Sequence, residues 1–413
     1  MAIFENYIKQ IKKIVKLNSN INNNNNHHNH YHNIIINTIK LAFSEFDNTD
    51  IINYSHTEQI YGKSFNSIPI LIRKTISKNK QYNNTIKFNI NKRSFQINFI
   101  SNKKTNIDKN TIKMVYIILF LCDNLSNSDY CSNNLIIYIY LTNHKKSLPN
   151  HYNNISLDHS HVNTAFTYSC VKENNIYIFR EEEWFKCFIH ECLHAFGFDF
   201  AQTYSRENDI YASKIIQKIF PLNFDLNLNE SYTELFSIYL NCILKGFFST
   251  YNKNSLNFNS KVIDKAILLL NDELYFSLFQ CSKIFDHYNI NYDLLHNNNK
   301  SVLTKYDENT PVFSYFVIKT ILLYNFNDFF TWAIKNNKNI IHFNCNNIND
   351  YINKNNKSKK NKCFTKIKSY CQLIINNYKK NDFINDIHKI HQIFIQTKSK
   401  TFIHKSLRFT IYG

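Results

Sequence analysis

The segment His190-Glu-Cys-Leu-His-Ala-Phe-Gly197, HECLHAFG, decides how the rest of this 413-residue chain is interpreted. It continues the run EEEWFKCFI, whose apolar residues recur at helical spacing, so we expect it to lie on a helix. Two histidines four residues apart leave the same face of a helix with their Cβ atoms about 5–6 Å apart. Two imidazole nitrogens at that spacing can bind one zinc ion. Glu191 is then placed to act as general base on a water that the metal activates.

Gly197 supports this interpretation. The chain has only four glycines, and one of them follows the second histidine by three residues. At that point the chain must leave the helix, and a left-handed backbone turn favours glycine. The sequence therefore predicts a metal site on this helix, and two histidines on an ordinary helix are the alternative.

A catalytic zinc also needs a third protein ligand and an open position. The string HECLHAFGFDF resembles the metzincin pattern, in which the third ligand falls three residues after the glycine. Phe200 occupies that position here and cannot bind zinc. Asp199, one residue earlier, is expected to accept a hydrogen bond from a ligand histidine.

A better third ligand lies downstream in LNESYTELFSIYL. It resembles the gluzincin pattern, in which a glutamate on a second helix completes the metal site and an acid four residues later supports a ligand histidine. Glu230 is the favoured ligand and Glu234 the alternative. Two solvated glutamates would be the neutral explanation, but the chain has only 13 glutamates and these two share a helix face in an apolar segment. The 36 residues from His194 to Glu230 exceed the commonest gluzincin spacing.

The runs FREEEWFKCFIHECLHAFGFDF and NESYTELFS together resemble the metallopeptidase-like proteins of large nucleocytoplasmic DNA viruses. Further similarity extends through NTAFTYSC, TPVFSYFVIKTILL and the closing SLRFTIYG. The resemblance implies an α+β fold with a zincin-like catalytic domain. That domain would contain a small mixed sheet, the HExxH helix and a second helix with the glutamate ligand, followed by a mainly helical C-terminal part. The resemblance carries no substrate identity.

The first functional hypothesis is a zinc metallopeptidase acting on protein or peptide substrates, more as an endopeptidase than as an exopeptidase. Glu191 would be its general base and Zn²⁺ its cofactor. An oxyanion stabiliser is also needed, and the candidates are Tyr232, Tyr239, His161 and Tyr211. NTAFTYSC or NIYIFR is expected to offer the sheet edge along which a peptide lies. The alternatives are a non-catalytic zinc-binding viral structural or assembly protein, and a basic nucleic-acid-associated protein.

The composition indicates what the protein binds and in which compartment it occurs. The formal net charge is +18, but only five of the 49 basic residues are arginine, so a solvated lysine surface is favoured over phosphate binding. Ten cysteines without a CxxC pair predict reduced core thiols and an intracellular compartment, the host cytoplasm or virion if the protein is viral. The N-terminus lacks the apolar block of a signal peptide. The longest apolar run, MVYIILFLC from Met114, is too short to span a bilayer.

The expected organisation has five parts. They are an amphipathic helix at 1–17, an Asn/His-rich disordered linker at 18–33, an N-terminal α/β region at 34–134, the zincin-like core at 135–246, and a mainly helical region at 247–413 with a Lys/Asn-rich loop at 353–362.

Overall fold

The computed structural model describes the chain except for residues 1, 20, 22–25, 105, 127–128, 150–154, 202–204, 252–256, 344–356 and 400. The chain forms two compact units. The first, here called the helical unit, comprises Met1–Asn29, Lys146–Val162 and Thr203–Tyr412. The second, here called the sheet unit, comprises His30–Lys145 and Asn163–Gln202, together with Gly413.

The sheet unit is built on a six-stranded mixed sheet in the order β1-β2-β3-β4-β6-β5. Strands β1, β2 and β3 are antiparallel, β3, β4 and β6 are parallel, and β5 is antiparallel to β6. The sequence from Ile86 to Ile100 alternates between apolar and polar residues around a turn at Asn91–Lys92, which predicts a hairpin. The pairing of β2 with β3 confirms it, and Asn91 lies in the left-handed region at φ 50°. The strands are β1 (Ile52–His56), β2 (Tyr82–Ile90), β3 (Arg93–Ser101), β4 (Asn134–Tyr140), β5 (Ala165–Thr167) and β6 (Glu173–Ile178).

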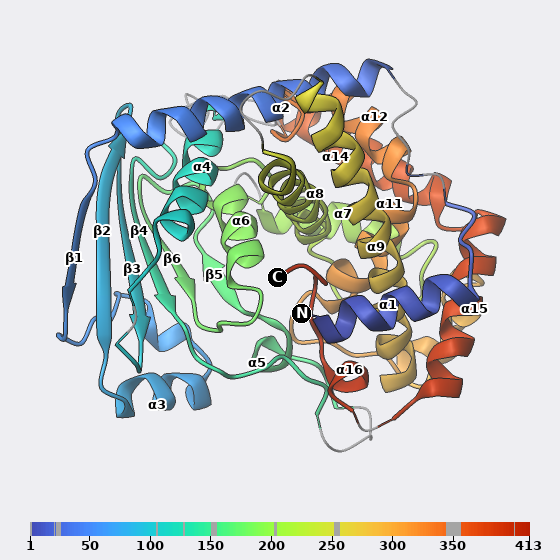
Figure 1. The fold of residues 1–413 in the computed structure, drawn as a ribbon. Coiled ribbons are helices and arrows are strands. Elements are labelled where there is room, and N and C mark those ends of the chain that lie inside the picture. Colours follow the sequence, from blue (N-terminus) through green and yellow to red (C-terminus); the bar gives the residue numbers. More distant parts are fainter. Residues whose placement is uncertain are drawn as a thin grey trace. The chain divides into compact units, whose positions relative to one another are not determined.

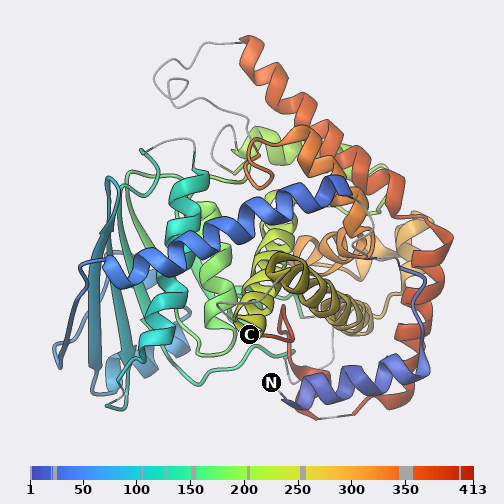
Figure 2. The same cartoon turned by 45° about the horizontal axis from the view of Figure 1, so that its top comes forward.

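Helices α4 (Lys109–Leu125) and α6 (Trp184–Ala195) cover the same face of this sheet, as both ribbon views show (Figures 1 and 2). The strands present Ile97, Ile137 and Ile176 to that face, and each is at most 1% exposed. The opposite face is covered in part by α3 (Ile70–Lys78) and by stacked tyrosines. Because both faces of the central strands are buried, β4 is a continuous apolar run.

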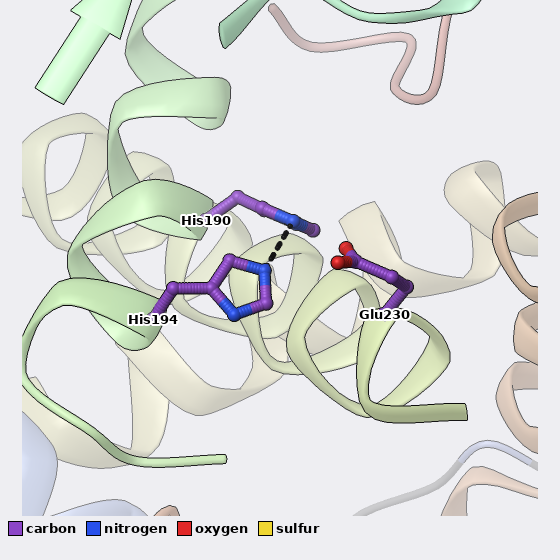
Figure 3. Close-up of side chains that lie close together, drawn as sticks. All are labelled: His190, His194 and Glu230. Carbon is purple, nitrogen blue, oxygen red and sulfur yellow. Dashed lines mark hydrogen bonds between the residues drawn. The ribbon is translucent and has the colours of Figure 1, made fainter. Parts of the chain in front are cut away.

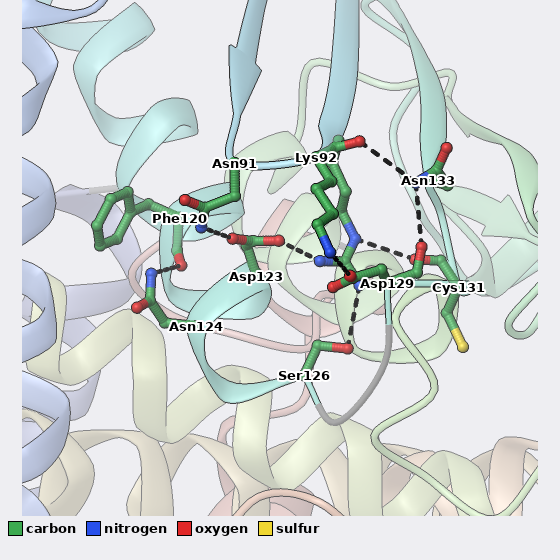
Figure 4. Close-up of polar contacts among 10 residues, drawn as sticks. Asn91, Lys92, Phe120, Asp123, Asn124, Ser126, Asp129, Cys131 and Asn133 are labelled. Atoms are coloured by element: carbon green, nitrogen blue, oxygen red, sulfur yellow. Dashed lines mark hydrogen bonds and ion pairs between the residues drawn. The ribbon is translucent and has the colours of Figure 1, made fainter. Parts of the chain in front are cut away.

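A buried ion pair joins the β2–β3 hairpin to the end of α4 (Figure 4). The Arg93 guanidinium donates to the Asp123 carboxylate, which also accepts from the side-chain amide of Asn91. Arg93 Nε donates to the Cys131 carbonyl at 3.2 Å, and Nη2 donates to Ser126 Oγ at 3.2 Å. Both charged residues are less than 9% exposed, so these bonds compensate for the lost hydration of the pair.

The helical unit confirms the expected mainly helical C-terminal region. Its long helices α8 (Leu228–Thr250) and α9 (Phe258–His287) pack side by side, and α9 also contacts α1 (Ala2–Ile14) and α15 (Asn381–Thr397). Gly246 allows the α8–α9 approach, because a Cβ there would lie 2.8 Å from the Val262 carbonyl oxygen. The other helical elements are α5 (His159–Val162), α7 (Ser205–Ile216), α10 (Tyr292–His296), η3 (Lys300–Thr304), the π-helix η4 (Phe313–Ile318), α11 (Lys319–Tyr324), α12 (Phe326–Asn336), α14 (Lys357–Asn377) and α16 (Phe402–Lys405).

The predictions of an irregular linker at 18–33 and of a loop at 353–362 are wrong in part. Residues 26–33 of the first segment begin helix α2 (Asn26–Glu45), and residues 357–362 of the second begin α14. Residues 22–25 and 353–356 lie outside the described part of the chain. His28 explains the first error. It is 4% exposed, its ring lies 5.1 Å from that of Phe330, and its Nε2 lies 2.9 Å from Thr331 Oγ1. Tertiary packing thus gives the polar tract a buried side that its composition does not indicate.

The expected division at residue 134 differs from the compact units. Strand β3 pairs with β4 along its length, so the region before 134 and the strand after it belong to one sheet. The expected core at 135–246 is itself divided, because α6 belongs to the sheet unit and α8 to the helical unit. Strand pairing between distant segments cannot be read from local composition.

The expectation of ten reduced thiols is also wrong, because Cys131 and Cys170 form a disulfide across 39 positions of sequence. Six other cysteines are free and buried. Among the described residues, no helix combines the length and apolar character needed to cross a membrane.

Candidate metal centre

The two histidines of HECLH lie on α6, the helix that packs against β5, β6 and α4. Its apolar residues Phe188, Ile189 and Cys192 are fully buried, which fixes the rotation of the helix about its axis. His190 is 6% exposed and His194 is 7% exposed. Burial also raises the pKa of the Cys192 thiol well above its usual value, so this cysteine stays neutral and packs as an apolar residue.

The two imidazoles face each other across 3.1 Å between their Nε2 atoms (Figure 3). On the other side of the ring, His194 Nδ1 donates a hydrogen bond to Asp199 Oδ2. Since an ionised carboxylate only accepts, the ring proton of a neutral His194 lies on Nδ1 and leaves a lone pair on Nε2. Two nitrogens bound to one tetrahedral zinc at about 2.0–2.1 Å would lie roughly 3.3 Å apart. The pair therefore fits two ligands of one metal ion.

Gly197 ends α6 in the way that its position predicted. It has φ 75°, its N–H donates to the His194 carbonyl at 3.0 Å, and the N–H of Phe198 donates to the Leu193 carbonyl at 2.9 Å. These two bonds form a Schellman motif, which closes the helix and reverses the chain. The reversal brings Asp199 back to His194, where it accepts the expected hydrogen bond.

Two segments of the sheet unit hold the C-terminal end of α6 from outside. Ser132 Oγ donates to the Ala195 carbonyl at 2.8 Å, and the N–H of Cys170 donates to the His194 carbonyl at 3.3 Å. The disulfide between Cys131 and Cys170 joins these segments directly. The Ala195 carbonyl thus has a fixed partner, and the His194 carbonyl, which already accepts from the N–H of Gly197, gains a second donor. The backbone that carries His194 is consequently well constrained.

Glu230 lies in the first turn of α8, in the helical unit. Its Oε2 accepts a hydrogen bond from the Tyr315 hydroxyl at 3.0 Å, and its Oε1 lies 3.5 Å from the side-chain amide of Asn229. Glu234 follows one turn later on the same helix and is fully buried. Because α6 belongs to the sheet unit and α8 to the helical unit, the third ligand is given below as a proposal.

Glu191 is 7% exposed and directly follows the first histidine. Its role as general base is part of the proposal below.

The four candidates that the sequence offered for the oxyanion stabiliser contact different residues. The Tyr232 hydroxyl donates to the Ile341 carbonyl at 2.8 Å and accepts from Asn337, so its proton is already used in the helical core. Tyr239 packs its ring against Phe326 and Phe330. The other two candidates are His161, whose Nδ1 lies 2.9 Å from Asp158 Oδ1, and Tyr211, whose ring lies 4.8 Å from that of Phe364.

Tyr315, which contacts Glu230, was not among these candidates. No pattern within the segment TPVFSYFVIKTILL, which contains it, assigns a role to the tyrosine. Its partner lies 85 positions away, and only the folded helical unit brings the two together.

Comparison with known proteins finds a distant relative. The chain is 28% identical over 275 residues to the uncharacterized protein R210 of Acanthamoeba polyphaga mimivirus, across 62% of this chain and 66% of that protein. The match thus spans slightly less than two thirds of the length of the relative. No protein-family model and no solved structure matches the chain. The similarity is to a protein of a large DNA virus, and that protein carries no assigned activity.

Proposed function

We propose that this chain is a zinc-dependent metallopeptidase of gluzincin type in which His190, His194 and Glu230 hold the metal. The observation that carries the proposal is the histidine pair, with 3.1 Å between the Nε2 atoms and Asp199 behind His194. An acceptor behind a ligand histidine fixes its tautomer and raises its basicity. Two imidazole nitrogens and one carboxylate are a donor set typical of catalytic zinc.

The chemistry would be hydrolysis of a peptide bond. Zinc, when bound, polarises the scissile carbonyl and makes a water nucleophilic at neutral pH. Glu191 would take the proton of the attacking water and later give it to the leaving amine. Asp199 would keep the His194 proton on Nδ1 throughout, so that Nε2 remains available to the metal.

Strand β5 is the part of the sheet suited to a peptide substrate. It ends the strand order and is antiparallel to β6, whereas β6 lies between β4 and β5. The segment NIYIFR contains most of β6 and therefore has no sheet edge at which a peptide could bind. Of the two predicted segments, NTAFTYSC remains. An extended peptide would pair with the edge of β5 by main-chain hydrogen bonds. Such pairing can continue on both sides of the cleaved bond, which favours an endopeptidase.

Metal analysis tests the ligand set. We expect one zinc per wild-type chain, and a strong loss of affinity in Glu230→Ala. Glu234→Ala tests the alternative ligand, because it removes the carboxylate one turn along the same helix. A wild-type chain that binds no zinc contradicts the proposal. Loss of zinc in Glu234→Ala with none in Glu230→Ala would transfer the third ligand to Glu234.

Cleavage of a diverse peptide library by the zinc-loaded protein tests the activity. Glu191→Gln is expected to retain zinc and to lose cleavage, because the amide cannot accept the proton of the water. A Glu191→Gln variant as active as wild type would refute the mechanism. Zinc binding without cleavage of any peptide would favour the non-catalytic zinc protein instead.

A further inference from the structure

Tyr315 and Glu230 form a hydrogen bond within the helical unit. The Tyr315 hydroxyl donates to Glu230 Oε2 at 3.0 Å, and the tyrosine is only 6% exposed. The other oxygen, Oε1, has a longer contact with Asn229 at 3.5 Å. A bond from a neutral hydroxyl to a carboxylate is charge-assisted and directional. It therefore fixes which oxygen of Glu230 faces Tyr315 and which is turned away from it.

The backbone around Tyr315 is unusual. Residues Phe313–Ile318 form the π-helix η4, in which the N–H of Lys319 bonds to the Ser314 carbonyl five residues earlier. Single π turns inside helical segments are rare and often occur at functional sites. The wider turn changes the direction of its side chains relative to a continuous α-helix, and Tyr315 points from it to the first turn of α8.

The start of this π turn is held by a buried carboxyl group. Glu308 Oε2 accepts from the N–H of Phe313 at 2.7 Å and from the Tyr306 hydroxyl at 2.7 Å. The ring of Tyr315 packs against Phe409 of the C-terminal segment, with 4.9 Å between centroids. The backbone and the ring of Tyr315 are thus both constrained, so its hydroxyl has a defined position.

We propose that Tyr315 is a positioning residue that orients the Glu230 carboxylate for metal binding. This inference rests on the proposed zinc site. Partners behind metal ligands determine the rotation and basicity of those ligands, and their loss lowers metal affinity. Tyr315 thus does for Glu230 what Asp199 does for His194. Asp199 lies five residues from its ligand, whereas Tyr315 lies 85 residues from Glu230.

A packing role for Tyr315 is separable from this positioning role. The contact with Phe409 uses the ring, whereas the bond to Glu230 uses the hydroxyl alone. Tyr315→Phe keeps the ring and removes the hydroxyl. Tyr324→Phe is the matched control, because Tyr324 in α11 donates to the Asp386 carboxylate at 2.7 Å within the same unit.

The test is zinc affinity by competition with a chelating dye, together with the visible absorption of the Co²⁺-substituted protein, whose bands report coordination. We expect Tyr315→Phe to weaken zinc binding by about 10- to 100-fold and to shift the Co²⁺ bands. Tyr324→Phe is expected to change neither. In a Glu230→Ala background, adding Tyr315→Phe should have no further effect, since the residue acts through that carboxylate.

The outcomes separate this inference from the proposed function. Zinc binding by wild type with unchanged affinity in Tyr315→Phe overturns the role of Tyr315 and leaves the zinc site intact. An equal loss in Tyr315→Phe and Tyr324→Phe also overturns it, because the effect is then general destabilisation. A wild-type chain that binds neither zinc nor Co²⁺ overturns both proposals.

Discussion

Replacing Asp199 by asparagine tests the geometry behind His194 most directly. The Asp199 side chain is fully buried. Its Oδ2 accepts from His194 Nδ1, and its Oδ1 accepts from the N–H of Ala201 at 3.1 Å. Asparagine keeps the shape of the side chain but has one acceptor oxygen and one NH₂ donor. The two N–H groups that face Asp199 therefore cannot both be satisfied in the variant.

Both orientations of the new amide should weaken zinc binding at the proposed site. If its oxygen faces His194, a neutral acceptor replaces a charged one and the imidazole becomes a weaker ligand. If its NH₂ group faces His194, the ring proton must move to Nε2, the nitrogen that faces His190. We expect the zinc dissociation constant to rise by about 10- to 100-fold, which corresponds to roughly 1.4–2.8 kcal/mol.

The assay is dye competition for zinc at neutral pH, with chemical unfolding to verify that the variant is folded. Asp293→Asn is the control, because Asp293 Oδ1 lies 3.0 Å from His296 Nε2 in a more exposed Asp–His pair on α10, outside the proposed site. That variant should bind zinc as wild type does. If Asp199→Asn does so as well, the reasoning about the tautomer of His194 is refuted.

Three further predictions concern stability. Burial raises the pKa of Glu308 from 4.5 to about 8, so between these two pH values the folded state keeps the carboxyl proton and the unfolded chain has lost it. The stabilisation by this proton is complete below pH 4.5 and is lost as the pH rises through 8. In this range the free energy of unfolding in urea should fall by up to ~1.4 kcal/mol per pH unit, and Glu308→Gln should remove that dependence; equal slopes in wild type and variant would contradict the prediction. Arg93→Met leaves Asp123 as an unpaired buried charge and should cost about 3–5 kcal/mol in urea unfolding, with recovery in Arg93→Met/Asp123→Leu. Absence of recovery would mean that the charge is not the cause. The double variant Cys131→Ser/Cys170→Ser opens a loop closed across 39 positions. It should lower the free energy of unfolding by roughly 4 kcal/mol, measured against wild type under oxidising conditions, and unchanged stability would show that the bond contributes little.

Local sequence determined the parts of this protein that depend on neighbouring residues. The spacing of His190 and His194, the helix that carries them, and the turn at Gly197 all follow from patterns within eight residues. Asp199 could be predicted as a partner of His194 because the turn at Gly197 is local as well. The β2–β3 hairpin and the long helices beyond Gly246 followed for the same reason.

Local patterns failed where the structure depends on distant segments. The Asn/His tract was expected to be irregular, yet His28 is buried against Phe330, more than 300 positions away. The disulfide between Cys131 and Cys170 has no spacing signature, because strand pairing and the end of α6 bring its two loops together. The edge position of β5 likewise depends on the strand order of the sheet.

The residues of the proposed zinc site also differ in what predicts them. The HECLH sequence predicts the two histidines and Glu191, since a helix fixes the relation between residues four apart. Only the tertiary structure showed that β5, and not β6, ends the strand order of the sheet. Likewise, only the tertiary structure showed that the Tyr315 hydroxyl donates to Glu230, 85 positions away. The physical reason is that a hydrogen bond between remote segments depends on the packing of the whole unit, which no local periodicity encodes.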